Sequence, residues 1–144
     1  MKIKFILSVF LLFTMLAFGQ QDKRDQLKAI KSSRIAAALN LSATESQKFW
    51  PVYLQCEGKT SDIEEKMAVL KNKLSEKNID ALTQKEAVLY EAQLQSDEEE
   101  IFALRKKMIT DLKVIIGPKK ILKLKMAEDD FTKLLVKKIK GKKD

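Results

Sequence analysis

Residues 42–74 of the chain, SATESQKFWPVYLQCEGKTSDIEEKMAVLKNKL, carry apolar or small side chains at alternating intervals of four and three residues. An α-helix has 3.6 residues per turn, so this spacing places them along one stripe of a helix. The stripe predicts a continuous buried seam on one long helix. The residues of this seam are Phe49, Tyr53, Cys56, Thr60, Ile63, Met67, Leu70 and Leu74.

The first residues of this segment form a helix start. Ser42 and Glu45 have the spacing of a capping box, in which the Ser42 hydroxyl accepts the Glu45 amide and the Glu45 carboxylate reaches back. Pro51 lies inside the helix, where proline removes a hydrogen-bond donor, so we expect a kink at 47–51. Cys56 falls within the seam, which favours a small buried apolar side chain over a redox or intermolecular thiol.

A shorter helix is predicted before it, over residues 22–39. Its apolar residues recur on one side and most of its basic residues fall elsewhere, as in an amphipathic helix. Asn40 and Leu41 end this segment. The apolar positions are Leu27, Ile30, Ile35, Ala38 and Leu39.

A longer helix is predicted after a polar turn at 75–80. Thr83 and Glu86 repeat the capping-box spacing, so this third helix begins there and continues to Ile115 or Ile116. At about 1.5 Å per residue, it spans on the order of 50 Å. This length predicts an elongated molecule.

A corner at Gly117 and Pro118 separates the third helix from the last one. Glycine readily adopts the left-handed conformation that closes a helix, and proline is favoured at the first position of the next. The last helix ends in a basic tail, 137–143, for which a solvated tail is favoured and contact with anionic headgroups is the alternative. Its apolar positions are Ile121, Leu124, Phe131, Leu134, Leu135 and Ile139.

Residues 1–19 have the pattern of a secretory signal peptide. Two lysines precede an apolar run at 5–18, and Ala17 and Gly19 supply small residues for cleavage before Gln20. The run is shorter than the roughly 20 residues that a membrane-spanning helix needs. We therefore expect export to the periplasm; an apolar first helix of the domain is the alternative.

The mature chain, 20–144, is predicted to be one all-α domain, an elongated bundle or hairpin of about four helices. The full chain contains 28 Lys and Arg against 20 Asp and Glu, a formal charge of +8, and loss of two signal-peptide lysines leaves +6. In the cell envelope this charge favours acidic proteins or anionic lipid headgroups as partners. Basic and aromatic residues do not interleave, so nucleic acid is not expected as a partner.

The residue inventory argues against catalysis. The chain has no histidine and one cysteine, which removes the commonest general base, the commonest transition-metal ligand and any internal disulfide. The acidic run Asp97, Glu98, Glu99 and Glu100 points in four directions around a helix, so it favours a solvated face over a metal site. We expect no catalytic residue, no metal and no cofactor.

Two short motifs, Leu41-Ser42-Ala43-Thr44-Glu45 and Ile116-Gly117-Pro118-Lys119-Lys120, lie at the second helix start and at the predicted corner. In this layout the chain resembles the Spy and CpxP family of envelope-stress proteins, whose mark is a Leu-Thr-x-x-Gln motif that occurs twice. The first motif keeps the capping function, with Ser for Thr and Glu for Gln. The second keeps only its place at a helix corner. Residues 45–53 look more like the branch described as sensors of ECF-type sigma factors.

The resemblance implies a non-enzymatic, curved, helical dimer. Such a protein either reports envelope stress through a partner, such as the periplasmic domain of an anti-sigma factor, or holds unfolded clients as an ATP-independent chaperone. A neighbouring branch senses nickel or cobalt through histidines. This chain has none, so that activity does not carry over.

One candidate contact patch lies at the expected kink. Trp50, together with Phe49 and Tyr53, could anchor a partner, because aromatic side chains on a preorganised surface make good binding anchors. The alternative is that these residues belong to the core. Phe49 and Tyr53 fall on the seam, so Trp50 is the better candidate.

A second candidate surface lies on the long third helix. Two copies packed antiparallel about a two-fold axis near Phe102 would set the acidic run, 97–100, against Arg105, Lys106 and Lys107 of the other copy. Exposed charge pairs contribute only about 0 to 1 kcal/mol each, so apolar contacts would have to supply most of the association. The sequence therefore predicts an antiparallel homodimer.

Overall fold

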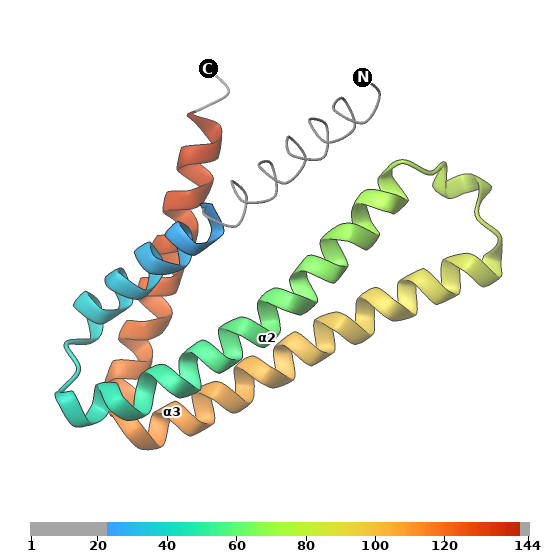
Figure 1. Ribbon diagram of the computed structural model, residues 1–144. Helices are drawn as coiled ribbons and strands as arrows, with labels where there is room; N and C mark the ends of the chain where they lie inside the picture. Colours follow the sequence, from blue (N-terminus) through green and yellow to red (C-terminus); the bar gives the residue numbers. More distant parts are fainter. Residues whose placement is uncertain (1–22, 142–144) are drawn as a thin grey trace, which may run out of the picture. The chain divides into compact units, whose positions relative to one another are not determined.

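The computed structural model describes residues 23–141, and all regular secondary structure in this range is helical, as predicted (Figure 1). The predicted signal peptide, 1–19, and the end of the basic tail, 142–144, lie outside the described residues. The elements are a helix at 23–39, α2 (Ala43–Ser75), the 3-10 helix η1 (Ile79–Ala81) and α3 (Gln84–Lys140).

Helix α3 includes both the third and the fourth predicted helices. It extends over 57 residues, but Gly117 has φ 74° and ψ 166°, which is not helical. The positive φ agrees with the prediction, whereas ψ is extended rather than left-handed helical. The described residues therefore contain three α-helices, the last with an internal break, because helical geometry resumes at Pro118 without an intervening loop.

The described residues divide into two compact units, whereas the sequence predicts one domain. One unit combines residues 23–40 with 122–141, and the other is Leu41–Ile121. Helical periodicity identifies the apolar face of each helix but not the helix that covers it. The pairing of the two ends of the chain could therefore not be predicted.

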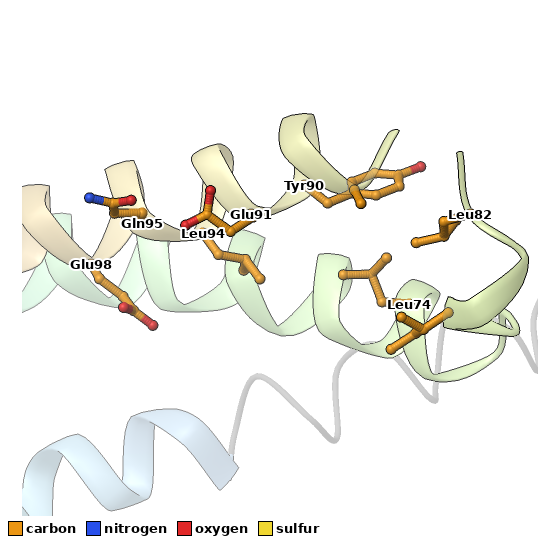
Figure 2. A pocket seen from close by; sticks show the side chains of 9 residues that line it. Leu74, Leu82, Tyr90, Glu91, Leu94, Gln95 and Glu98 are labelled. Atoms are coloured by element: carbon orange, nitrogen blue, oxygen red, sulfur yellow. The ribbon is translucent and has the colours of Figure 1, made fainter. Parts of the chain in front are cut away.

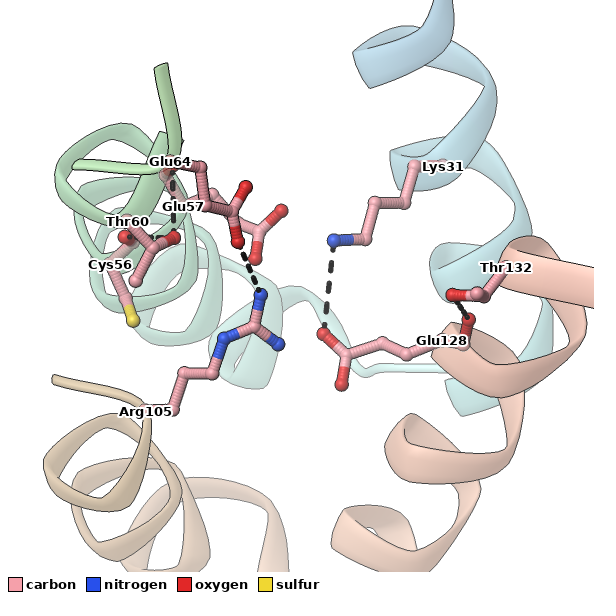
Figure 3. Close-up of polar contacts among 8 residues, drawn as sticks. All are labelled: Lys31, Cys56, Glu57, Thr60, Glu64, Arg105, Glu128 and Thr132. Carbon is pink, nitrogen blue, oxygen red and sulfur yellow. Dashed lines mark hydrogen bonds and ion pairs between the residues drawn. The ribbon is translucent and has the colours of Figure 1, made fainter. Parts of the chain in front are cut away.

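The unit formed by the chain ends is held together by a small apolar core and a charge pair. Ile35 and Leu39 are fully buried, as predicted, whereas Leu27, Ile30 and Ala38 are exposed. The Lys31 ammonium lies 4.0 Å from the Glu128 carboxylate (Figure 3). The buried side chains that α3 contributes to this unit are Leu124, Ala127 and Phe131.

The predicted helix ends are confirmed. Asn40 has a positive φ of 45° after the first helix, a conformation that asparagine tolerates. The Glu45 amide donates to the Ser42 hydroxyl at 3.2 Å, and the Ser42 amide donates to the Glu45 carboxylate at 2.8 Å. Thr83 and Glu86 form the same reciprocal pair at 3.2 and 2.9 Å.

In the second unit, α2 and the first part of α3 form an antiparallel hairpin (Figure 1). Helix α2 runs unbroken through Pro51, and the expected kink stays a prediction. The polar seam residue Thr60 donates its hydroxyl to the Cys56 carbonyl at 3.0 Å, which satisfies it in the core. The buried residues of the predicted seam are Phe49, Tyr53, Cys56, Thr60, Ile63 and Met67.

Burial along the hairpin changes from one end to the other. Near Gly117 the facing residues of α3 are fully buried, beginning at Met108. Towards the linker that joins the helices, beyond Met67 in α2, the same two seams are only half-buried. The apolar faces are therefore incompletely covered at the linker end. The half-buried seam residues are Leu70, Leu74, Tyr90, Leu94, Ile101 and Leu104.

Candidate functional site at the open end of the hairpin

The linker end of the hairpin contains an apolar groove of about 460 Å³, here called the tip groove (Figure 2). Side chains from the end of α2, from η1, from the linker and from the first turns of α3 form its walls. All of them belong to the unit Leu41–Ile121. The lining residues are Leu74, Ile79, Leu82, Ala87, Tyr90, Glu91, Leu94, Gln95 and Glu98.

The linker contributes apolar side chains because it is partly ordered as a 3-10 helix. Asn78 caps η1, and its side-chain oxygen accepts the Asp80 amide at 3.1 Å. The predicted polar turn at 75–80 is therefore only partly correct. Ser75 still belongs to α2, and Ile79 lines the tip groove.

The charges at the tip groove are mostly negative. Glu91 and Glu98 are exposed on its rim, and in the described part of the chain neither carboxylate makes a hydrogen bond or ion pair. The Lys77 ammonium lies 5.7 Å from the centre of the Tyr90 ring, a cation-π distance. An apolar floor with an acidic rim can bind a segment that is both apolar and cationic.

The predicted aromatic patch is mostly core. Phe49 and Tyr53 are 0% and 1% exposed, which favours the alternative that they belong to the core, and their contact with a partner stays a prediction. Their rings stack at 5.4 Å, and Trp50 meets Phe49 edge-on at 4.9 Å. Trp50 lies beside the seam rather than on it and is half-buried, so it alone of the three has surface available for a partner.

The two motif segments meet in the structure. Lys120, the last residue of the second motif, places its ammonium 2.6 Å from the Glu45 carboxylate of the first. This hydrogen bond, followed by the one from the Ser42 backbone, lowers the pKa of Glu45 below its ordinary value of 4.5. Glu45 therefore both caps α2 and ties its start to the residues after Gly117.

This contact predicts a pH effect on stability. Because the pKa of Glu45 is lower in the folded protein than in the unfolded chain, its ionised form stabilises the fold above pH 4.5, and this stabilisation is lost as the pH falls through the lowered pKa. Glu45→Gln should therefore destabilise the protein at pH 7 and flatten the acid decline in urea unfolding. Glu100→Gln, an exposed residue of α3, is the control. Equal acid declines for wild type and Glu45→Gln would contradict the assignment.

Two residues of the acidic run predicted for dimer pairing make hydrogen bonds within α3. Asp97 accepts a hydrogen bond from Gln93 at 2.9 Å, and Glu99 accepts one from Gln95 at 2.9 Å. Glu98 lies at the tip groove and Glu100 is exposed. These four residues thus do not converge on one point.

The basic run contacts carboxylates of the same unit. Arg105 lies 3.5 Å from Glu64 on α2 (Figure 3), and Lys107 lies 2.6 Å from Asp111. Lys106 is exposed. Pairing with a second copy would therefore have to compete with these intramolecular contacts.

The other predicted chemistry is limited to Cys56, which is buried in the seam as expected. Over residues 23–141, no group of three or more His, Cys, Asp or Glu side chains could hold a metal ion. In the same range no helix is long and apolar enough to cross a membrane.

Comparison with known proteins adds no relative. No family model, curated protein or solved structure matches this chain. The site is therefore interpreted from its own geometry and chemistry.

The tip groove was not predicted from the sequence. The helical spacing of Ala87, Tyr90 and Leu94 indicates that they share one apolar face of a helix. This spacing is the feature of the sequence that could have pointed to the groove. The sequence does not show that α2 ends before it can cover them. Leu74 was predicted as part of the seam and Glu98 as part of the acidic run, but not as neighbours.

Proposed function

We propose that this protein is an exported, non-enzymatic sensor or regulator of envelope stress that acts by binding a protein partner in an ECF-type sigma factor pathway. The partner would be an envelope protein such as the periplasmic domain of an anti-sigma factor. The tip groove carries the proposal, because an open apolar groove between helices suits the binding of an extended or helical protein segment. The capping box at Ser42 and Glu45 belongs to the first of the two motifs on which the resemblance to the Spy and CpxP family rests.

The test is affinity capture of the tagged protein after brief crosslinking in its own cells, with bound proteins identified by mass spectrometry. One dominant inner-membrane partner is the expected result. Trp50→Ala is a useful variant, because loss of that partner without loss of stability would place Trp50 in the contact. Capture of no protein above the level of an untagged strain would contradict the proposal.

An ATP-independent chaperone is the second candidate. Large apolar side chains are exposed in both units, and such surface can hold unfolded clients without a single fixed partner. A broad set of unrelated envelope proteins that grows under unfolding stress would favour this function over the sensor. The most exposed examples are Phe102, Val114, Leu122 and Ile139.

The antiparallel homodimer belongs to the same proposal. Reversing Arg105, Lys106 and Lys107 to glutamate should shift sedimentation towards the monomer, and added salt should then no longer weaken association, because the facing acidic runs would repel each other instead of pairing. Since Arg105 and Lys107 also contact Glu64 and Asp111, circular dichroism must first confirm that the variant folds. An unchanged sedimentation profile would rule this arrangement out.

A further inference from the structure

The shape of the tip groove limits what can occupy it. Its volume of about 460 Å³ lies within the range of sites that hold small molecules or a few side chains of a peptide. The groove is open along α3, where Ala87, Tyr90 and Leu94 follow each other at helical intervals of three and four. A groove with apolar positions in this order suits the apolar face of an amphipathic helix.

The charge at the rim of the tip groove further limits which kinds of partner can bind there. Glu91 and Glu98 are seven residues apart, two helical turns, so the two residues lie about 10 Å apart along the axis of α3. These are the two charged residues that line the groove, in a protein whose overall charge is +8. Their negative charge opposes acidic peptides and anionic lipids and attracts lysine or arginine.

The aromatic side chain that lines the groove, Tyr90, can also lie beside a cation. Tyr90 already has the Lys77 ammonium at a cation-π distance of 5.7 Å. The ring thus already holds the chain's own cation beside apolar side chains, and the basic residues of a partner have Glu91 and Glu98 as their available charges. Lysine and arginine of a partner can place their aliphatic stems on the apolar floor and their charges at Glu91 or Glu98.

We propose that the tip groove binds a cationic amphipathic helix of a partner protein, with its apolar face on Tyr90 and Leu94 and its basic residues at Glu91 and Glu98. This inference rests on the proposed function, since it describes how that partner is recognised. It assigns the contact to the linker end of the hairpin rather than to the aromatic residues around Trp50.

The direct test uses two synthetic helical peptides, one of leucine and lysine and one with every lysine replaced by glutamate, titrated into the full chain by calorimetry. We expect the lysine peptide to bind and the glutamate peptide not to bind. The double variant Glu91→Gln/Glu98→Gln should weaken binding of the lysine peptide about three- to tenfold. It should also reduce the salt dependence of that binding, because two exposed charge pairs are lost. Leu94→Glu should abolish binding.

The matched control is Asp62→Asn/Glu100→Gln, which removes the same charge from exposed positions outside the tip groove. Equal binding of the two peptides, or an equal loss in this control, would overturn the proposal. The charge-neutral variants change only exposed side chains, so they remain informative if Leu94→Glu fails to fold. Self-association that Glu91→Gln alone weakens would also overturn it, in favour of a second copy as the occupant, because Glu91 lies outside the acidic run of the proposed dimer.

The cellular capture experiment separates this inference from the proposed function. If Glu91→Gln/Glu98→Gln retains the captured partner at the wild-type level, the partner binds elsewhere, and only the inference about the tip groove fails. If the lysine peptide binds at the tip groove but no partner is captured in cells, the groove assignment holds and the proposed function fails.

Discussion

Replacing Phe49 by alanine is expected to lower the free energy of unfolding by about 3 to 5 kcal/mol. The side chain is 0% exposed and stacks on Tyr53, so its removal loses buried apolar surface and leaves a cavity. Urea unfolding followed by far-ultraviolet circular dichroism measures the change. This is the largest effect that we expect from any single substitution in the chain.

Trp50→Ala is the comparison for this variant. Trp50 touches the same rings edge-on but is only half-buried, so its truncation should cost clearly less than that of Phe49. The pair thus separates the core side chain from its neighbour on the surface. A loss for Phe49→Ala no greater than that for Trp50→Ala would show that the aromatic cluster is not organised around Phe49.

Replacing Gly117 by alanine is expected to lower the free energy of unfolding by about 1 to 3 kcal/mol. Gly117 has φ 74° and ψ 166°, a region that residues with a Cβ atom almost never occupy. Apart from the adjoining backbone, no atom lies within 4 Å of the position that a Cβ would take, so the cost comes from the backbone conformation rather than from a clash with a packed neighbour. Thermal and urea unfolding both measure it.

Gly58→Ala is the matched control, with an effect of opposite sign. Gly58 lies within α2, and a Cβ atom there would also meet no other atom within 4 Å, so alanine should stabilise the helix by about 0.5 to 1 kcal/mol. Stabilisation by both substitutions would mean that the chain at Gly117 adopts an ordinary helical conformation in solution.

The features that the sequence predicts well are local. Ser42 and Glu45 form a capping box through contacts three residues apart, and the α2 seam follows from the helical period alone. Both depend on side chains of a single segment. The same is true of the end of the first helix at Asn40, where one residue adopts a positive φ.

The features that the sequence does not predict depend on which segments of the chain contact one another. The contact between Glu45 and Lys120 joins residues 75 positions apart, and no spacing rule predicts it. Tyr90 and Leu94 have the same pattern as buried seam residues, yet they line a groove because α2 ends at Ser75. The position of the candidate site is therefore a property of helix length and linker geometry rather than of any motif.

Because Cys56 is buried, the reactivity of its thiol reports opening of the hairpin formed by α2 and α3. Cys56 is the only cysteine of the chain and the third of the eight residues of the α2 seam, where it is 6% exposed. Burial slows the attack of a thiol reagent on the closed hairpin, so labelling accelerates when α2 and α3 separate at that point. The rate at which the thiol is labelled therefore measures how often the hairpin opens, without any engineered probe.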